Sequence, residues 1–236
     1  MSTSLRQGIR RETAAERRTS QQTFAYEAPP VTLLDRIMPA WDAARAEHRV
    51  IDAPALQVYE AALDADFLDA VRQHRAVRLL FSIRSGVERL IAAVQRRPWV
   101  EAPPPQALRL ADLPARGEWI RLGQDPPREI VFGAIGRFWA GETKWLAIDH
   151  AAFGAFYNEG FAKIACQLLV QPLPDGRTRL TYAVRTWATD PASARAFRRY
   201  WNVTSPFIGV VMRAFLALVE REAGRFSVAF GVGTKH

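Results

Sequence analysis

The stretch from residue 190 to residue 223 constrains the fold most, because it combines a helical repeat with many large aromatic side chains. It opens with Asp190 and Pro191, an acidic N-cap followed by proline at the first helical position, where the missing N–H costs nothing. Pro206 lies inside the run and predicts a bend. The large apolar residues recur at helical spacing along one side: Phe197, Tyr200, Trp201, Phe207, Val211, Phe215 and Leu218. Such a helix needs a broad partner surface.

The segments before this helix supply that surface. Residues 47–52 are typical of a first strand, and Val31–Trp41 of a short helix or a packing arm. Helical patterns then begin at Pro54, after Asp66, and at Ala76, the last running to Gln95. The period next changes to that of strands, in six segments: Ala107–Asp112, Glu118–Gly123, Glu129–Trp139, Lys144–Asp149, Phe161–Gln171 and Arg177–Ala188.

The links between these strands are short, which favours antiparallel pairing. Asp175-Gly176 between two long alternating runs is a strong hairpin signal. The order therefore predicts an α+β fold, a curved seven-stranded antiparallel sheet wrapped on the long C-terminal helix. We assign residues 31–223 to this single domain, residues 1–30 to a basic leader that is disordered or loosely packed, and residues 224–236 to a tail.

The net charge of +8 bears on binding partners. An arginine-rich surface suits nucleic acid or an anionic membrane, and also follows from composition bias alone. Arg72, Arg75 and Arg78 share a helix face, but no DNA- or RNA-binding motif accompanies them. We therefore expect a solvated face and no nucleic acid, and we keep a transient contact with an anionic membrane as an alternative.

Cysteine and histidine usage argues against a metal site. Cys166 is the only cysteine, which excludes a disulfide framework within the chain. No two of the four histidines have metal-ligand spacing: His48, His74, His150 and His236. There is no nucleotide-binding fingerprint, so we expect no cofactor. The longest apolar run, Phe207–Val219, is too short to span a bilayer, and no signal sequence is present, which predicts a cytoplasmic location.

Several stretches resemble a known family: Pro127–Gly133, Gly136–Trp139, Phe156 with Gly160–Lys163, Thr181–Arg185, Thr189-Asp190 and Phe197–Trp201. With the order of elements, they resemble the helix-grip fold of the START / Bet v 1-like (SRPBCC) superfamily, in a bacterial subgroup of largely unassigned role. The resemblance covers about residues 31–223. Two positions depart from the subgroup: Glu159 replaces its usual proline before Gly160, and Ala183 replaces its usual glutamate two residues before Arg185.

The resemblance implies an apolar cavity between the sheet and the C-terminal helix. Superfamily members bind lipids, sterols, polyketides or other hydrophobic molecules there, and some catalyse cyclisation or dehydration. We predict that seven residues bind the ligand: Arg185, Trp187, Lys163, Tyr182, Trp139, Trp201 and Phe197. The aromatic members of this set are equally consistent with ordinary core packing.

Two of these seven are cations, and their roles depend on which face of the sheet is concave. Thr181, Ala183, Arg185 and Trp187 share one face of their strand. If that face is concave, Arg185 is a buried cation that needs a partner or an anionic ligand. The carboxylates considered as its partner are Glu129, Glu142, Asp149 and Asp190. Lys163 is either a base or carboxylate anchor with a lowered pKa, or a lysine at a strand end in solvent.

Three functions remain open. The preferred one is a soluble carrier of a hydrophobic small molecule, since the sequence has no catalytic constellation and no assignable catalytic residue. The second is a polyketide cyclase or dehydratase-like enzyme without metal or nucleotide, favoured if titratable side chains converge in the cavity. The third is a non-enzymatic module that binds a partner or an anionic surface, favoured if the core is filled.

Overall fold

The computed structural model describes residues 31–69, 109–114, 116–139 and 143–230, with side chains up to residue 225. The predicted leader, the predicted helix Ala76–Gln95 and the end of the tail lie outside the described residues. The proposed division into leader, domain and tail therefore stays a prediction. Everything below concerns the compact unit that begins at Thr32.

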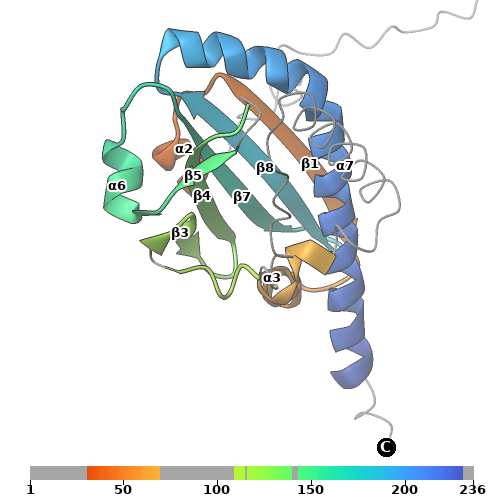
Figure 1. The fold of residues 1–236 in the computed structure, drawn as a ribbon. Helices are drawn as coiled ribbons and strands as arrows, with labels where there is room; N and C mark the ends of the chain where they lie inside the picture. The colour runs from red at the N-terminus through yellow and green to blue at the C-terminus, as the bar shows by residue number, and fades with distance from the viewer. Residues whose placement is uncertain (1–30, 70–108, 115, 140–142, 231–236) are drawn as a thin grey trace, which may run out of the picture. The chain divides into compact units, whose positions relative to one another are not determined.

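Antiparallel strands form the centre of this unit (Figure 1). In sheet order they are β1 (Ala43–Ile51), β8 (Thr178–Ala188), β7 (Ala162–Pro172), β4 (Glu129–Arg137) and β3 (Trp119–Asp125), with β5 (Lys144–Leu146) paired to β4. A separate pair joins β2 (Arg116–Gly117) to β6 (Ile148–Asp149). The helices are α2 (Leu33–Ile37), α3 (Ala55–Asp64), α6 (His150–Ala155) and α7 (Pro191–Phe230).

This arrangement confirms the predicted α+β fold, an antiparallel sheet with a long closing helix. Within the part of the chain that the structure describes, the main sheet has six strands rather than the predicted seven. Of the predicted strand Ala107–Asp112, the described residues form only one bridge, from Arg109 to Asp66, followed by a turn. The predicted hairpin at Asp175-Gly176 is confirmed, with Gly176 at a φ of 85°.

The predicted strand Lys144–Asp149 is divided between β5 and β6, and a helix that the sequence did not predict follows it. The cause is Asp149, whose carboxylate accepts a 2.8 Å hydrogen bond from the N–H of Ala152 and caps the first turn of α6. This short helix matters because it covers part of one face of the sheet.

Side chains alternate between the two faces of each strand, and different elements cover the two faces. The inner face, toward α7 and α3, carries the even-numbered residues of β4, β7 and β8, such as Phe132, Cys166 and Tyr182. The outer face, toward α2 and α6, carries the odd-numbered ones, such as Val131 and Ala165. Each face has its own buried apolar cluster. Whether a residue of these three strands has an even or an odd number therefore decides on which face its side chain lies and which helices it can contact.

The long helix α7 crosses one end of the sheet and then turns to run along it (Figure 1). Pro206 lies inside the helix and lacks the N–H that would bond the carbonyl of Asn202. Nearby, the hydroxyl of Thr204 donates a 2.9 Å hydrogen bond to the carbonyl of Tyr200, which also favours bending. The path of α7 agrees with the predicted bend. Phe207, predicted on the buried side, is 44% exposed where the helix changes direction.

After Pro206, α7 packs against β1, β8 and α3, and Phe215 and Val219 are buried there. Taken over Pro191–Arg225 rather than over its longest apolar run, α7 is long and apolar enough to cross a membrane. It is the one such helix among the described residues, and 39% of its most apolar 18-residue window is buried inside the protein. The packing of its second half is that of a helix that closes a domain core.

Charged side chains hold this half of α7 to β1. Glu47 accepts hydrogen bonds from Arg45 at 2.6 Å and from Arg213 of α7 at 2.8 Å. Burial raises the pKa of Glu47, but these two guanidinium groups more than offset that effect and keep the pKa below its usual value. Gly209 permits the close approach, since a Cβ there would collide with the Arg45 side chain.

The N-terminus of α7 is capped as predicted. The Asp190 carboxylate accepts hydrogen bonds from the N–H groups of Ala192 (2.9 Å), Ser193 (2.8 Å) and Gly160 (2.7 Å). The bond from Gly160 also ties the start of α7 to the turn before β7. Hydrogen bonds from Ser193 first, and then from Gly160 and Ala192, lower the pKa of Asp190 to about 2.

We predict that Asp190→Asn removes part of the acid sensitivity of the fold. The folded-state pKa is depressed, so ionised Asp190 stabilises the protein above its unfolded-state pKa, and that contribution is lost as the pH falls from about 4 to about 2. Asparagine still caps a helix but cannot ionise. The difference in urea midpoint between wild type and Asp190→Asn should shrink across this window. An equal difference at both ends would contradict the assignment.

A glycine in β4 sits at a crowded point of the sheet. A Cβ at Gly133 would clash with the main-chain oxygen of Ile164 on β7 and lie 2.7 Å from the Leu122 side chain. Neither a paired main-chain atom nor a buried leucine can move away cheaply. Gly224 near the end of α7 has open space around its Cβ position and offers a matched control.

We predict that Gly133→Ala lowers the free energy of unfolding by about 1–3 kcal/mol, the usual cost of overpacking. Gly224→Ala should instead raise it by about 0.5–1 kcal/mol, since alanine loses less backbone entropy in a helix. Urea denaturation of the two variants measures both effects. Equal stability of the two variants would show that the sheet accommodates a methyl group at Gly133.

Candidate ligand-binding site

Aromatic rings form a connected series along the inner face. Each ring lies near at least one other, with centroid distances from 5.2 to 6.3 Å. From the start of α7 to its second half, the aromatic series comprises Tyr200, Trp201, Phe197, Trp139, Phe138, Trp145, Trp119, Phe132, Tyr182, Phe215 and Phe67. Phe197, Phe132, Tyr182 and Phe215 are buried, and the other rings are half-buried. The series therefore joins the core to solvent-accessible rings.

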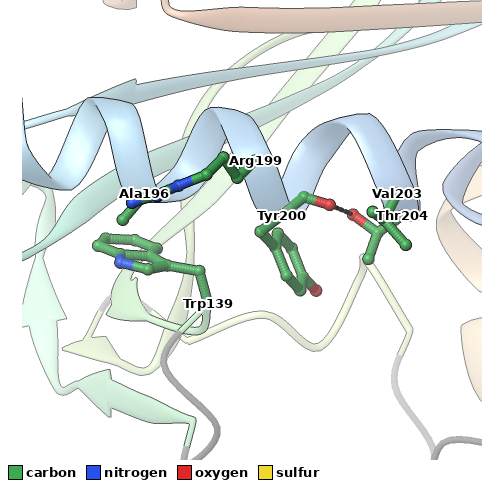
Figure 2. A pocket seen from close by; sticks show the side chains of 6 residues that line it. All are labelled: Trp139, Ala196, Arg199, Tyr200, Val203 and Thr204. Atoms are coloured by element: carbon green, nitrogen blue, oxygen red, sulfur yellow. Dashed lines mark hydrogen bonds between the residues drawn. The ribbon is translucent and has the colours of Figure 1, made fainter.

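The accessible end of the series opens into a groove on the first half of α7. The groove has a volume of about 490 Å³ and is lined by Trp139, Ala196, Arg199, Tyr200, Val203 and Thr204. Figure 2 shows the Trp139 indole below Ala196 and the Tyr200 side chain on the same side of the helix. The hydroxyl of Thr204 already donates to the carbonyl of Tyr200. The other polar side-chain groups of the lining are the Arg199 guanidinium, the Tyr200 phenol and the Trp139 indole N–H.

Four of the seven predicted site residues belong to the aromatic series. Phe197 lies at the centre of the accessible end, with its ring 5.9 Å from Trp139 and 5.8 Å from Trp201. Tyr182 lies deeper on the inner face, 5.8 Å from Phe215. The structure therefore brings these side chains together on the face where the sequence predicted a cavity. Contact with a ligand stays a prediction.

Three buried polar side chains of the inner-face cluster, Cys166, Tyr182 and Tyr59, are poor nucleophiles and poor bases. Burial raises the pKa of the Cys166 thiol to about 12, although a hydrogen bond with Tyr182 acts in the opposite direction. Burial also raises the pKa of Tyr182 well above its usual value. Tyr59 of α3 has a buried hydroxyl without a hydrogen-bond partner in the described structure, and burial raises its pKa too. All three groups stay protonated at neutral pH.

Arg185 lies on the outer face, away from the aromatic series. Its guanidinium donates to the Asp35 carboxylate at 2.6 Å and to the carbonyl of Met38 at 2.9 Å, and it stacks on Trp41 at 3.9 Å. Three of the carboxylates considered from the sequence, Glu129, Asp149 and Asp190, are not its partners, and the fourth, Glu142, lies outside the described residues. Arg185 thus fastens α2 and the chain after it to the sheet.

The sequence signal that identifies Asp35 is a capping box. Thr32 accepts from the N–H of Asp35, and Asp35 accepts from the N–H of Thr32, at the start of α2. Burial raises the pKa of Asp35, while hydrogen bonds from Thr32 and Arg185 lower it, and the net result is a lowered pKa. A helix start of this kind places its carboxylate where an arginine of the sheet can reach it.

Lys163 and Trp187 also lie on the outer face, beneath α6. Lys163 is 6% exposed and donates a 3.0 Å hydrogen bond to the carbonyl of Gly154. Its ammonium lies 4.6 Å from the Tyr157 ring centroid and 5.4 Å from that of Trp187. Burial lowers the pKa of Lys163, as predicted for a buried lysine. The sheet separates this cluster from the groove, and a ligand role for Lys163 or Trp187 stays a prediction.

The predicted set also missed residues that the structure brings to the inner face. Trp119, Phe132 and Phe138 belong to the aromatic series but were not proposed as site residues. The alternation of side chains along a strand identifies Phe132 as an inner-face residue, because it pairs with Cys166 between β4 and β7 and paired residues lie on the same face. No pattern in the sequence identifies Trp139 and Arg199 as neighbours. Among the described residues, no group of three or more histidine, cysteine or acidic side chains could hold a metal ion.

We predict that Arg185→Met destabilises the fold but leaves ligand uptake intact. The substitution removes the guanidinium donor from the Asp35 carboxylate and from the carbonyls of Leu34 and Met38, at a cost of about 1–3 kcal/mol in free energy of unfolding. Arg179→Met, at an exposed position of the same strand face, is the matched control and should cost less than about 0.5 kcal/mol. Loss of uptake in folded Arg185→Met would give Arg185 a role in binding.

No protein-family model matches this sequence, and no curated protein matches it significantly. Solved structures with low similarity include a protein from Thermus thermophilus, with 10% identity and a TM-score of 0.33 over 78% of this chain and 99% of the other. A protein from Mesorhizobium loti has 15% identity and a TM-score of 0.35, over 78% of this chain and 98% of the other. The Zhui aromatase/cyclase from a Streptomyces species has 13% identity and a TM-score of 0.28, over 81% and 99%.

The fold assignment rests on this chain's own elements. A first strand, a helical insertion, an antiparallel meander and a long C-terminal helix on the inner face occur in that order. The chain has a helix-grip-like α+β fold, an antiparallel sheet closed by a long C-terminal helix. Membership of the START / Bet v 1-like (SRPBCC) superfamily stays a prediction from the sequence.

Proposed function

We propose that this protein binds and carries a hydrophobic small molecule, held against the inner face and entering through the groove on α7. The observation that carries the proposal is the aromatic series, which runs without a break from the half-exposed rings of the groove to the buried core. Half-exposed rings such as Trp139 and Trp201 keep apolar surface in water. A ligand that covers them gains the free energy of removing that surface from water.

The groove suits a ligand with an apolar body and one polar end. Its volume of about 490 Å³ lies within the range of small-molecule sites, roughly 300–1,000 Å³. The Trp139 ring and the Ala196 and Val203 side chains supply apolar walls, while Arg199 and Tyr200 supply one cation and one phenol. This combination favours a lipid, a sterol, a polyketide or another aromatic molecule that carries a hydroxyl, carbonyl or carboxylate group.

Binding without chemistry is preferred over catalysis because of the inner-face groups that the structure describes. Cys166, Tyr182 and Tyr59 are buried, and burial raises the pKa of each. A cyclase or dehydratase needs a group that exchanges protons near neutral pH. The even-numbered residues of β4, β7 and β8 include no carboxylate or histidine, and the Glu47 carboxylate on the same side of β1 is already paired with Arg45 and Arg213.

The first test is native mass spectrometry of freshly purified protein, followed by solvent extraction and identification of any bound molecule. A stoichiometric apolar molecule would support the carrier proposal and give its chemical class. Purified protein that carries nothing, and that takes up no fatty acid, sterol or aromatic probe, would refute it. Conversion of the extracted molecule on incubation with the protein would favour the enzyme.

We predict that Trp139→Ala weakens uptake of a fluorescent apolar probe by roughly tenfold or more, because it removes one wall of the groove. Trp187→Ala is the matched control, since it removes the same side chain from the opposite face of the sheet. It should change uptake by roughly twofold at most, because the two sites share no contacts. Circular dichroism establishes that both variants are folded. Equal losses in the two variants would place the ligand elsewhere.

A further inference from the structure

The first half of α7 has an unusual distribution of charge. Residues 191–210 contain three arginines, no lysine and no acidic residue. Arg195, Arg198 and Arg199 are exposed and lie within little more than one helical turn. Arg198 reaches Asp42 at 3.8 Å, with its side chain still 61% exposed. Arg195 and Arg199 have no ion pair with any residue that the structure describes. This surface is therefore strongly positive.

Exposed apolar side chains continue the same surface. Val203 is 68% exposed, the largest value among the exposed large hydrophobic residues described, and Phe207 is 44% exposed. Arg199, Val203 and Phe207 are spaced four residues apart and so follow one another along the helix. We call the exposed surface formed by Arg195, Arg198, Arg199, Val203 and Phe207 the basic–apolar face of α7. Val203 and Arg199 also line the groove.

We propose that the basic–apolar face of α7 docks on an anionic phospholipid surface. The arginines contact lipid phosphates, and Val203 and Phe207 enter the headgroup region. The proposal rests on the carrier function, because docking places the mouth of the groove against the bilayer from which an apolar ligand would be taken or to which it would be delivered. It names the partner and the surface that the carrier uses.

Two alternative occupants fit this face less well. A nucleic acid would pair with the arginines through its phosphates but would leave Val203 and Phe207 without apolar contacts. A second copy of the chain would bring like charges together, since each copy presents Arg195, Arg198 and Arg199 without a nearby acidic residue on α7. An anionic membrane provides negative charge and apolar depth in one surface.

Docking on the membrane surface, rather than spanning the bilayer, follows from the burial of the second half of α7. Met212, Phe215 and Leu216 pack in the core against the sheet and α3. Insertion of that half into a bilayer would require the core to come apart. The exposed half can contact lipid while the rest of the helix keeps its contacts.

The test measures flotation of the full-length protein, without added ligand, on two kinds of vesicle. One is phosphatidylcholine alone, and the other is phosphatidylcholine mixed with phosphatidylglycerol. We expect binding to the anionic vesicles that weakens with added salt, and little binding to the neutral ones. Wild-type protein that fails to float with anionic vesicles at low salt would overturn the proposal.

Substitutions at residues of the basic–apolar face that do not line the groove test which side chains contact the vesicle. The double variant Arg195→Gln/Arg198→Gln, and separately Phe207→Ser, should each weaken vesicle binding by roughly tenfold. The matched controls are Arg177→Gln/Arg179→Gln, at exposed positions in and beside the β7–β8 hairpin, and Leu56→Ser, a 56%-exposed leucine of α3. The controls should bind as wild type. Equal losses in controls and test variants would overturn the assignment of the face.

Two further measurements, probe uptake and sedimentation, distinguish failure of the docking proposal from failure of the carrier proposal. Probe uptake in solution should be unchanged in Arg195→Gln/Arg198→Gln and in Phe207→Ser, so loss of docking with intact uptake supports the proposal as stated. Vesicle binding by a protein that takes up no apolar molecule would refute the carrier function but not the docking surface. A dimer in sedimentation experiments that Phe207→Ser dissociates would assign the face to a second copy and overturn the membrane proposal.

Discussion

The contact between the second half of α7 and the sheet supports every other feature of this structure. Phe215 and Val219 bury apolar surface against β8 and α3, while Arg213 meets Glu47 of β1. Apolar burial supplies most of the free energy, and the ion pairs fix the position of the helix along the strand. Because this half is held, the first half can extend over the end of the sheet with less burial of its own. The groove lies on the first half, where Phe197 is buried against Trp139 but Val203 is exposed.

The sheet separates two kinds of chemistry. On the inner face, the even-numbered residues of β4, β7 and β8 are all uncharged, and burial keeps the Tyr182 phenol protonated. Charges on this side, such as Glu47, lie on the edge strand β1, where they pair with α7. On the outer face, Arg185, Lys163 and the fully buried Glu129 each fasten a covering element, with Glu129 accepting hydrogen bonds from Gln167 and from the N–H of Leu34. Buried charge is costly without partners, so placing it under α2 and α6 keeps the inner face free for apolar contacts.

Much of the fold could be predicted from the sequence, because it follows from local patterns. The Asp190 cap, the hairpin at Gly176 and the period of α7 each involve residues close in the chain. The placement of Arg185 and Lys163 could not be predicted, because the face that a strand residue occupies depends on which elements later cover the sheet. Phe197, Trp139 and Trp201 were predictable as large aromatics, whereas the contact of Phe197 with Phe138 joins positions about sixty residues apart in the chain.

The proline inside α7 has a mechanical consequence. At Pro206 the helix lacks one main-chain hydrogen bond, so the two parts of α7 are joined by a backbone that is softer there than elsewhere. The change of direction there lets one helix serve two surfaces: Phe215 and its neighbours lie in the core, while Tyr200 and Val203 line the groove with Trp139.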